Sequence, residues 1–214
     1  MATRAEQIRA SERAWWRRLP RLLIRPREVY SALDDSDETA EALQEPIVAV
    51  TILAGIGMFL STATAGRLFD EYEFDWVLVL VEAFLAGTLV ALQNYWLGGA
   101  ALLIGLRSTG SMSRYRMARH LVGLATTPFV LALLVVWPVR LAIFGSDLFR
   151  SGGSDEGASG VVLAVVDGLF VAWALALLVV GVRTVQQWSW LRSLAAAAFA
   201  AALFALLVLA AVYA

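Results

Sequence analysis

Five polar side chains interrupt the long apolar stretches of this sequence, and they are its first candidates for chemistry: Glu82, Gln93, Asn94, Arg140 and Asp167. Glu82 and Asp167 can release a proton, Arg140 is a permanent cation, and the two amides can extend a hydrogen-bond network. Glu82 and Asp167 lie six positions from the start of their apolar stretches, and Arg140 lies five positions before Gly145, which follows its stretch. At about 1.5 Å per residue the three would share one depth, about 7 to 9 Å below the boundary of the apolar layer.

Two interpretations of this group stay open. An unpaired charge is costly in an apolar medium, so Arg140 placed between Glu82 and Asp167 would satisfy all three residues and hold their helices together. The same residues, with Gln93, could instead form a path for a proton or an ion. Small residues accompany the charges along each helix and allow close packing, which favours the structural interpretation.

The sequence carries few groups that catalyse reactions. It contains no cysteine, no lysine and a single histidine, His120, which excludes disulfides, histidine-rich metal sites and Schiff bases. His120 is expected at a helix end beside Arg119, and Ser61 has no base near it in the sequence. Neither 108–113 nor 151–160 has the lysine of a phosphate-binding loop. We therefore predict no enzymatic activity, no cofactor and no metal.

The composition indicates which elements position these residues. Of the 214 residues, 60% are apolar and 16% are charged, which is too little polar surface to cover a soluble domain. About 20 apolar residues cross the hydrocarbon layer, so we predict an all-α polytopic membrane bundle with five transmembrane helices. The apolar runs are 46–65, 76–106, 120–144, 161–182 and 190–213.

The distribution of arginine predicts how the chain is inserted. Eight arginines precede the first run and six lie in the loops after the second and fourth runs, whereas three lie on the other side. Because arginine-rich loops stay in the cytoplasm, we predict a multi-pass protein of the cell membrane with its N-terminus inside and its C-terminus outside. The net charge of −1 gives no overall basic surface for nucleic acid.

Residues 1–45 are predicted to form a cytoplasmic tail, and residues 46–214 the membrane domain. Arginine alternates with tryptophan and leucine in the tail, an amphipathic pattern that suits the surface of an anionic leaflet. A solvated amphipathic helix is the alternative, and the acidic residues 34–45 form a linker. The tail side chains expected at the membrane surface are Trp15, Trp16, Arg17, Arg18, Arg21 and Arg25.

Two runs should be irregular. The second has 31 residues and, at about 46 Å, exceeds a layer of about 30 Å, so it must tilt or break at Gly98–Gly99. Pro128 lies midway in the third run and should kink it, with a neighbouring threonine able to bond the carbonyl that proline frees. The loop 108–113 between them is rich in glycine and serine and is predicted to be a flexible hinge.

Four segments occur in an order that resembles a known family: IRPREVY at 24–30, LVGLATTPFV at 121–130, WALALLVVGVR at 173–183 and WSWLR at 188–192. The family is that of the Yip-domain (Ypt-interacting protein) proteins, which are small five-span membrane proteins with a cytoplasmic N-terminus. The first segment is similar to that of prokaryotic members. The resemblance implies a membrane adaptor or organiser. Eukaryotic members bind small GTPases, but this tail lacks their Asp-Leu-Tyr-Gly-Pro motif, so GTPase binding is not carried over.

We therefore expect a non-enzymatic integral membrane protein, an adaptor or organiser that acts through its cytoplasmic Arg/Trp-rich face. Its partners would be the lipid bilayer and either another membrane protein or a second copy of the chain. The alternative is a small transporter or an ion or proton pathway through Glu82, Gln93, Arg140 and Asp167. A hydrated cavity at Glu82 and Gln93 would favour transport, whereas sealed helices would favour the adaptor.

Overall fold

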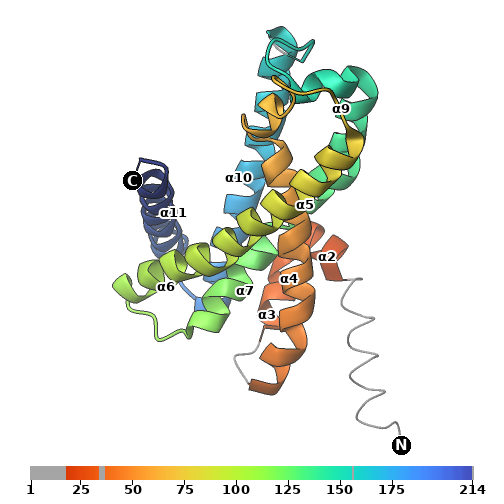
Figure 1. Cartoon of the computed structure of the whole chain (residues 1–214). Coiled ribbons are helices and arrows are strands. Elements are labelled where there is room, and N and C mark those ends of the chain that lie inside the picture. Colours follow the sequence, from red (N-terminus) through yellow and green to blue (C-terminus); the bar gives the residue numbers. More distant parts are fainter. Residues whose placement is uncertain (1–17, 34–36, 156, 214) are drawn as a thin grey trace, which may run out of the picture.

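The computed structural model describes residues 18–33, 37–155 and 157–213, and within these ranges the chain is helical and has no β-strand (Figure 1). Four helical segments of the described chain are long and apolar enough to cross a membrane. The chain is therefore an all-α, multi-pass membrane protein. The four segments are Trp76–Ser108, Tyr115–Phe149, Ala158–Gln186 and Trp190–Ala210.

The first apolar run forms part of helix α4 (Asp37–Leu60), whose buried side chains include Ile47, Val50 and Ala54. Its apolar part is Pro46–Leu60, shorter than the run expected from the sequence, and it is not among the four long segments. The helix ends early because the hydroxyls of Ser61 and Thr62 donate to carbonyls of its last turn. A short 3-10 helix, η1 (Ala65–Arg67), follows.

Helix α4 packs closely against α5 (Trp76–Gln93). A Cβ atom at Gly55 of α4 would overlap the backbone of Gly87 on α5, and one at Gly87 would overlap Ile56. Only glycine lets the two backbones approach this closely, as small residues do at many membrane helix contacts. Helix α4 also contacts α7 and α8, so it joins the second and third runs.

The second run is one continuous helix. It comprises α5, a π-helical turn η2 (Asn94–Gly98) and α6 (Gly99–Ser108). Gly98 and Gly99 keep helical dihedral angles, so the alternative of a break there is wrong. The helix crosses α4 obliquely in Figure 1, and this tilt accommodates its length of about 50 Å.

The third run is broken into shorter pieces. They are α7 (Tyr115–Ala125), α8 (Thr127–Leu131), a π-helical turn η3 (Ala132–Val136), α9 (Trp137–Phe144) and a 3-10 helix η4 (Gly145–Phe149). The interruption falls at Thr126, two residues before Pro128. Pro128 has no N–H for the carbonyl of Leu124, and the Thr127 hydroxyl donates to that oxygen instead, at 2.7 Å.

The last two helices are α10 (Ala158–Gln186) and α11 (Trp190–Tyr213). Gln187, with a φ of 53°, makes the sharp turn between them. Both figures show α11 diverging from the bundle, and it packs against α6, where Gly105 leaves room for the α11 backbone at Ala196. Most apolar side chains of α10 point outward, as expected for a helix surrounded by lipid.

Two short helices precede α4, namely α2 (Arg18–Ile24) and α3 (Pro26–Ser31). Leu22 and Tyr30 are fully buried in the main core cluster, and the Tyr30 ring occupies the space beside Gly181 of α10. The described part of the tail thus uses its apolar side to pack on the protein, rather than turning all of it toward lipid.

Candidate functional site

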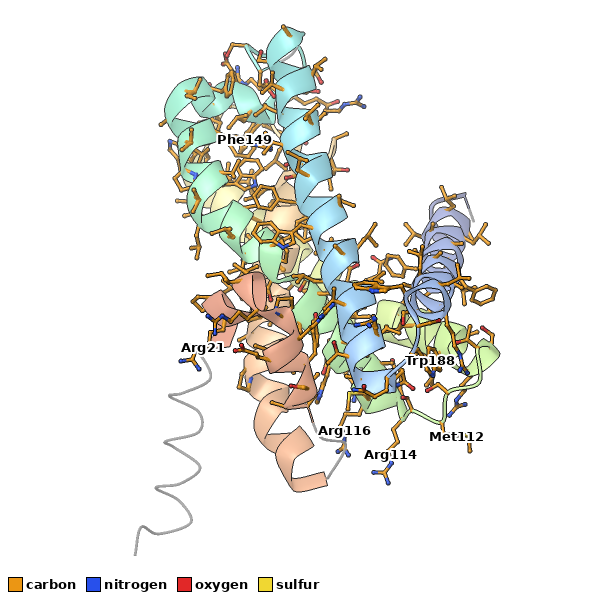
Figure 2. The ribbon with its side chains drawn as sticks, turned by 180° about the vertical axis from the view of Figure 1, so that it is seen from behind. Arg21, Met112, Arg114, Arg116, Phe149 and Trp188 are labelled. Carbon is orange, nitrogen blue, oxygen red and sulfur yellow. The ribbon has the colours of Figure 1, made fainter. Side chains whose placement is uncertain are left out.

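The charged side chains divide between two ends of the molecule, which we call the arginine end and the Phe149 end. Figure 2 shows Arg21, Arg114, Arg116 and Trp188 at the arginine end, opposite Phe149. Among the described residues, the exposed arginines at the arginine end are Arg21, Arg25, Arg27, Arg107, Arg114 and Arg192, and those at the Phe149 end are Arg67 and Arg150.

Arg119 of α7 is 9% exposed, and three aromatic rings surround its guanidinium. The Cζ atom lies 4.2 Å from the ring centre of Trp96, 4.8 Å from that of Tyr115 and 5.3 Å from that of Tyr95. The rings are fixed in turn, because the Tyr115 hydroxyl donates to the Trp96 carbonyl at 2.7 Å. Ring faces attract a cation without neutralising it, so this aromatic cage stabilises a buried positive charge.

Local sequence explains how the cage forms. The π-helical turn contains Tyr95 and Trp96, and Gly99 comes directly after it. A Cβ at Gly99 would lie 2.5 Å from Cγ of Arg119, so only glycine lets α6 and α7 pass this closely. The Nε and Nη1 atoms of Arg119 are buried and donate to no described residue. The guanidinium therefore keeps both its charge and unused donors.

A second set of arginine and tryptophan contacts joins the helix ends. Arg183 of α10 lies 4.6 Å from the ring centre of Trp190, and Arg27 of α3 lies 5.8 Å from the same ring. Arg192 lies 4.0 Å from the ring centre of Trp188. Through these contacts α3, α10 and α11 meet at one surface, with the indole rings expected at headgroup depth.

The loop 108–113 is bonded at both ends to neighbouring helices, unlike the flexible hinge that its composition predicts. Ser111 donates to the Gln186 side-chain oxygen at 2.8 Å, and the Gln186 amide donates to Ser113 at 2.5 Å. Arg192 donates through two nitrogens to the carbonyl of Thr109. These bonds come from helices α10 and α11, which are too distant in sequence for composition to reveal them.

The expected tail residues are only partly described. Trp15, Trp16 and Arg17 lie outside the described residues, and Arg18 begins α2. Arg21 and Arg25 are exposed, and Arg25 pairs with Glu28 at 3.3 Å across one helical turn. The Tyr30 hydroxyl, one turn further, has no hydrogen-bond partner among the described residues, and burial raises the pKa of Tyr30 well above its usual value.

The Phe149 end contains a charge pair of a different kind. Arg140 of α9 is 5% exposed and donates to the Asp167 carboxylate of α10 at 2.6 Å. Outside the apolar layer, the backbone N–H and hydroxyl of Ser151 both donate to Asp70 at 2.7 Å. These two bonds hold the pKa of Asp70 below its usual value. Carboxylates therefore accept hydrogen bonds from Arg140 and from Ser151 at this end.

Arg140 was expected to lie between two carboxylates, but it pairs with Asp167 and not with Glu82. Glu82 is partly exposed and makes no ion pair with any described residue. The reason is helix placement, because α5 packs chiefly on α4, whereas Asp167 is carried by α10, which the hydrogen bonds of Arg140 join to α9. A shared depth does not bring side chains together unless their helices are neighbours.

Gln93 and Asn94 also lie apart from the Arg140 pair. The Asn94 amide donates to the Val90 carbonyl one turn earlier, at 2.9 Å, and approaches the sulfur of Met58 at 3.6 Å. Neither Glu82 nor Gln93 lines the apolar groove beside Phe84 and Trp137 or the polar pocket beside Arg140. The five polar residues therefore do not form one connected network within the described chain.

The aromatic cage was not predicted from the sequence. Its signal is the pair Tyr95–Trp96, together with Tyr115 four residues before Arg119, which is the spacing of neighbours on one helical face. In the sequence, Arg119 stands out only as one of the loop arginines that predict orientation. Pairing of α6 with α7, which brings these rings together, is a tertiary property.

Comparison with known proteins gives one match. A family model described as the Yip1 domain matches residues 21–212 of the chain, from α2 to the end of α11. No curated protein and no solved structure matches it. The matched range begins in the described part of the tail, where Leu22 and Tyr30 belong to the core.

Proposed function

The chain belongs to the Yip1 domain family of membrane proteins, which is not known for enzymes, and from this premise we propose that it is a membrane adaptor or organiser. It would act through the arginine end, by contact with anionic lipid headgroups and with a membrane-protein partner or a second copy of the chain. The role involves no catalysis, cofactor, metal or nucleic acid. The absence of the eukaryotic GTPase-binding motif leaves small GTPases outside the proposal.

One observation carries this proposal, namely the unequal exposure of arginine at the two ends. The six exposed arginines at the arginine end include Arg21, Arg25 and Arg192, against two at the Phe149 end. Each cation near an anionic leaflet contributes about 1 kcal/mol of attraction. The cage adds Arg119, whose charge no described carboxylate neutralises. A lipid or protein partner with negative charge fits this surface best.

We further propose five membrane crossings, with the N-terminus in the cytoplasm and the C-terminus outside the cell membrane. Helix α4 supports a fifth crossing, because it runs from one end of the molecule to the other. At the arginine end, Ile47 of α4 packs with Tyr30 and Val182. At the Phe149 end, Asp70 in the segment after α4 accepts a hydrogen bond from Ser151. The positive-inside rule then assigns the arginine end to the cytoplasm.

Two finer assignments belong to the same proposal. The division into a tail (1–45) and a membrane domain (46–214) remains a prediction, in which residues 18–33 dock on the domain through Leu22 and Tyr30. Membership of the prokaryotic branch rests on the segment 24–30 and on a composition without lysine.

The proposal is tested by removing equal charge from the two ends. The double variant Arg21→Gln with Arg25→Gln is compared with Arg67→Gln with Arg150→Gln, in protein extracted into lipid nanodiscs directly from the membrane. Lipid analysis would measure enrichment of anionic lipid, and photo-crosslinking would record neighbouring proteins. We expect the first variant to lose anionic enrichment and crosslinks, because about 1 kcal/mol per arginine is removed from the headgroup layer.

The Arg67/Arg150 variant controls for net charge and should keep both properties. Thermal unfolding of the two variants checks that each remains folded, since all four side chains are exposed. If both variants retain the wild-type lipids and the wild-type crosslinks, the arginine end is not the working surface.

We do not extend the proposal to transport. The path predicted as the alternative requires Glu82, Gln93, Arg140 and Asp167 to be connected, and within the described chain only Arg140 and Asp167 meet. No other feature of the described residues favours a transported species.

A further inference from the structure

An apolar groove lies at the Phe149 end, on the opposite side of the bilayer from the arginine end. Helices α4 and α5 form one wall and the η3–α9 segment forms the other. Its volume is about 680 Å³, and its lining includes Leu60, Leu80, Phe84, Leu133, Trp137 and Leu141. Trp76, at the rim, and Phe84 are eight residues apart on α5, so the groove reaches about 12 Å into the hydrocarbon layer.

A polar pocket adjoins the groove. It has a volume of about 250 Å³ and shares Leu60 and Trp137 with the groove, so one molecule can occupy both. Its polar lining comes from four parts of the chain, namely the segment after α4, helix α9, the loop before α10 and α10 itself. The polar lining residues are Ser61, Thr62, Arg140, Asp155 and Asp167.

Two buried atoms of this pocket lack partners within the described chain. They are Nε of Arg140, which is a donor, and Oδ1 of Asp155, which is an acceptor. Leaving such atoms unsatisfied is costly, and buried polar groups are normally bonded to something. Asp155 also makes no ion pair with a described residue, so a negative charge remains beside the Arg140–Asp167 pair.

We propose that the groove and the pocket together bind one phospholipid whose head carries both a phosphate and a primary ammonium group, as in phosphatidylethanolamine. An acyl chain occupies the groove, where hydrocarbon and not water is the surrounding medium. The phosphate accepts from Nε of Arg140, and the ammonium donates to Oδ1 of Asp155. Both unsatisfied atoms thereby gain charge-assisted hydrogen bonds.

The charges of the pocket favour this phospholipid headgroup over other common lipid headgroups. A choline head has no N–H group, so Oδ1 of Asp155 would stay unbonded. A glycerol head has no cation to meet the extra carboxylate, and diacylglycerol has no phosphate for Arg140. A glycerol hydroxyl could donate to Asp155, but a head with both a phosphate and an ammonium group satisfies the donor and the acceptor and also places a cation beside the second carboxylate.

Native mass spectrometry of the full-length protein in detergent tests the proposal. Delipidated protein is titrated with phosphatidylethanolamine or phosphatidylcholine of identical acyl chains. We expect one phosphatidylethanolamine per chain, bound about tenfold more tightly than phosphatidylcholine, which corresponds to one charge-assisted hydrogen bond. In Asp155→Asn the two lipids should bind equally, because the carboxylate that recognises the ammonium is gone.

A pair of variants on α5 tests the groove. Leu80 is 69% exposed and lines the groove, whereas Leu89 is 67% exposed, does not line it and lies nine residues away on the opposite helical face. Leu80→Trp fills the groove and should weaken phosphatidylethanolamine binding about tenfold, as overpacking does elsewhere. Leu89→Trp adds the same ring to the lipid-facing surface and should bind like the wild type.

Circular dichroism and the unfolding midpoint confirm that each variant is folded before its binding is compared. Equal binding of the two lipids by the wild type, or equal binding by Leu80→Trp and Leu89→Trp, would overturn the proposal. This experiment does not involve the arginine end, so its result is separate from the test of the adaptor role.

Discussion

Arg119 and Arg140 are two buried arginines at opposite ends of one broken helix, and the chain stabilises them in different ways. Arg140 pairs with the Asp167 carboxylate at 2.6 Å, so its charge is neutralised. Arg119 has three aromatic rings within 5.3 Å of its Cζ and no described carboxylate, so its charge is retained. The comparison shows that a buried arginine can serve either to join helices or to keep a positive potential at a surface.

The two arrangements suit the two ends. A neutral pair is favourable within hydrocarbon, because an isolated charge there costs several kcal/mol. A caged cation is favourable near an anionic leaflet, because the aromatic faces stabilise it and negative headgroups lie close by. This difference predicts that removing a carboxylate will restore part of the stability lost by a mutation of Arg140, but none of the stability lost by a mutation of Arg119.

The largest effect is expected at the Phe149 end. Arg140→Gln leaves the Asp167 carboxylate without its partner, and we expect the free energy of unfolding in mixed micelles to fall by about 3 kcal/mol. Because Asp167 is 32% exposed, water screens part of the isolated charge and keeps the loss at the low end of the range for buried pairs.

The control for this prediction is the double variant Arg140→Gln with Asp167→Asn. It removes the unpaired charge and should regain part of the lost stability, as a double-mutant cycle would measure. Full additivity of the two single changes would show that the ion pair contributes nothing.

A smaller effect is expected at the arginine end. Arg119→Gln removes contacts with three rings, and we expect a loss of about 2 kcal/mol, which no carboxylate mutation should rescue. The matched pair Tyr115→Phe and Tyr115→Leu separates the ring from its hydroxyl. Tyr115→Phe keeps the ring face and should cost less than Tyr115→Leu in the same unfolding measurement. Equal losses for these two variants would contradict the cation–π interpretation of the cage.

The smallest effect concerns Asp70, which is exposed at the Phe149 end. Because Ser151 lowers the pKa of Asp70 in the folded state, its contribution is fully present above the usual value of 3.8 and is lost as the pH falls below it. The unfolding midpoint of the wild type should therefore exceed that of Asp70→Asn at neutral pH and approach it in acid. Ser151→Ala, which removes the hydroxyl donor, should reduce the difference. A constant difference across the pH range would exclude this carboxylate as its source.

Local features of this fold could be predicted from particular residues. Pro128 has no N–H, and a threonine beside it can bond the carbonyl left free, so an interrupted helix follows from the sequence near that point. The four longer apolar runs indicate membrane helices in the same way, because they exceed the length needed to cross the bilayer. The early end of α4 at Leu60 depends on Ser61 and Thr62, whose bonds an apolar run alone does not reveal.

The candidate site was less predictable. Residues of equal depth were expected to meet, yet Asp167 reaches Arg140 and Glu82 does not, because helix neighbours decide contacts. Composition suggested a flexible loop at 108–113, but hydrogen bonds from Gln186 and Arg192 hold it in place. Both outcomes depend on helices far apart in the chain.

The amino-acid sequence by itself determined that hydrocarbon surrounds the chain, that the chain is helical and that arginine is more frequent on one side of the membrane than on the other. These properties depend only on the type and order of the residues. Tertiary structure alone decided that Arg140 meets a carboxylate as well as the Trp137 ring, whereas Arg119 meets three rings and no described carboxylate. The physical reason is that these interactions act over a few ångströms, so they form only after close contacts such as Gly99 against Arg119 have fixed which helices are neighbours.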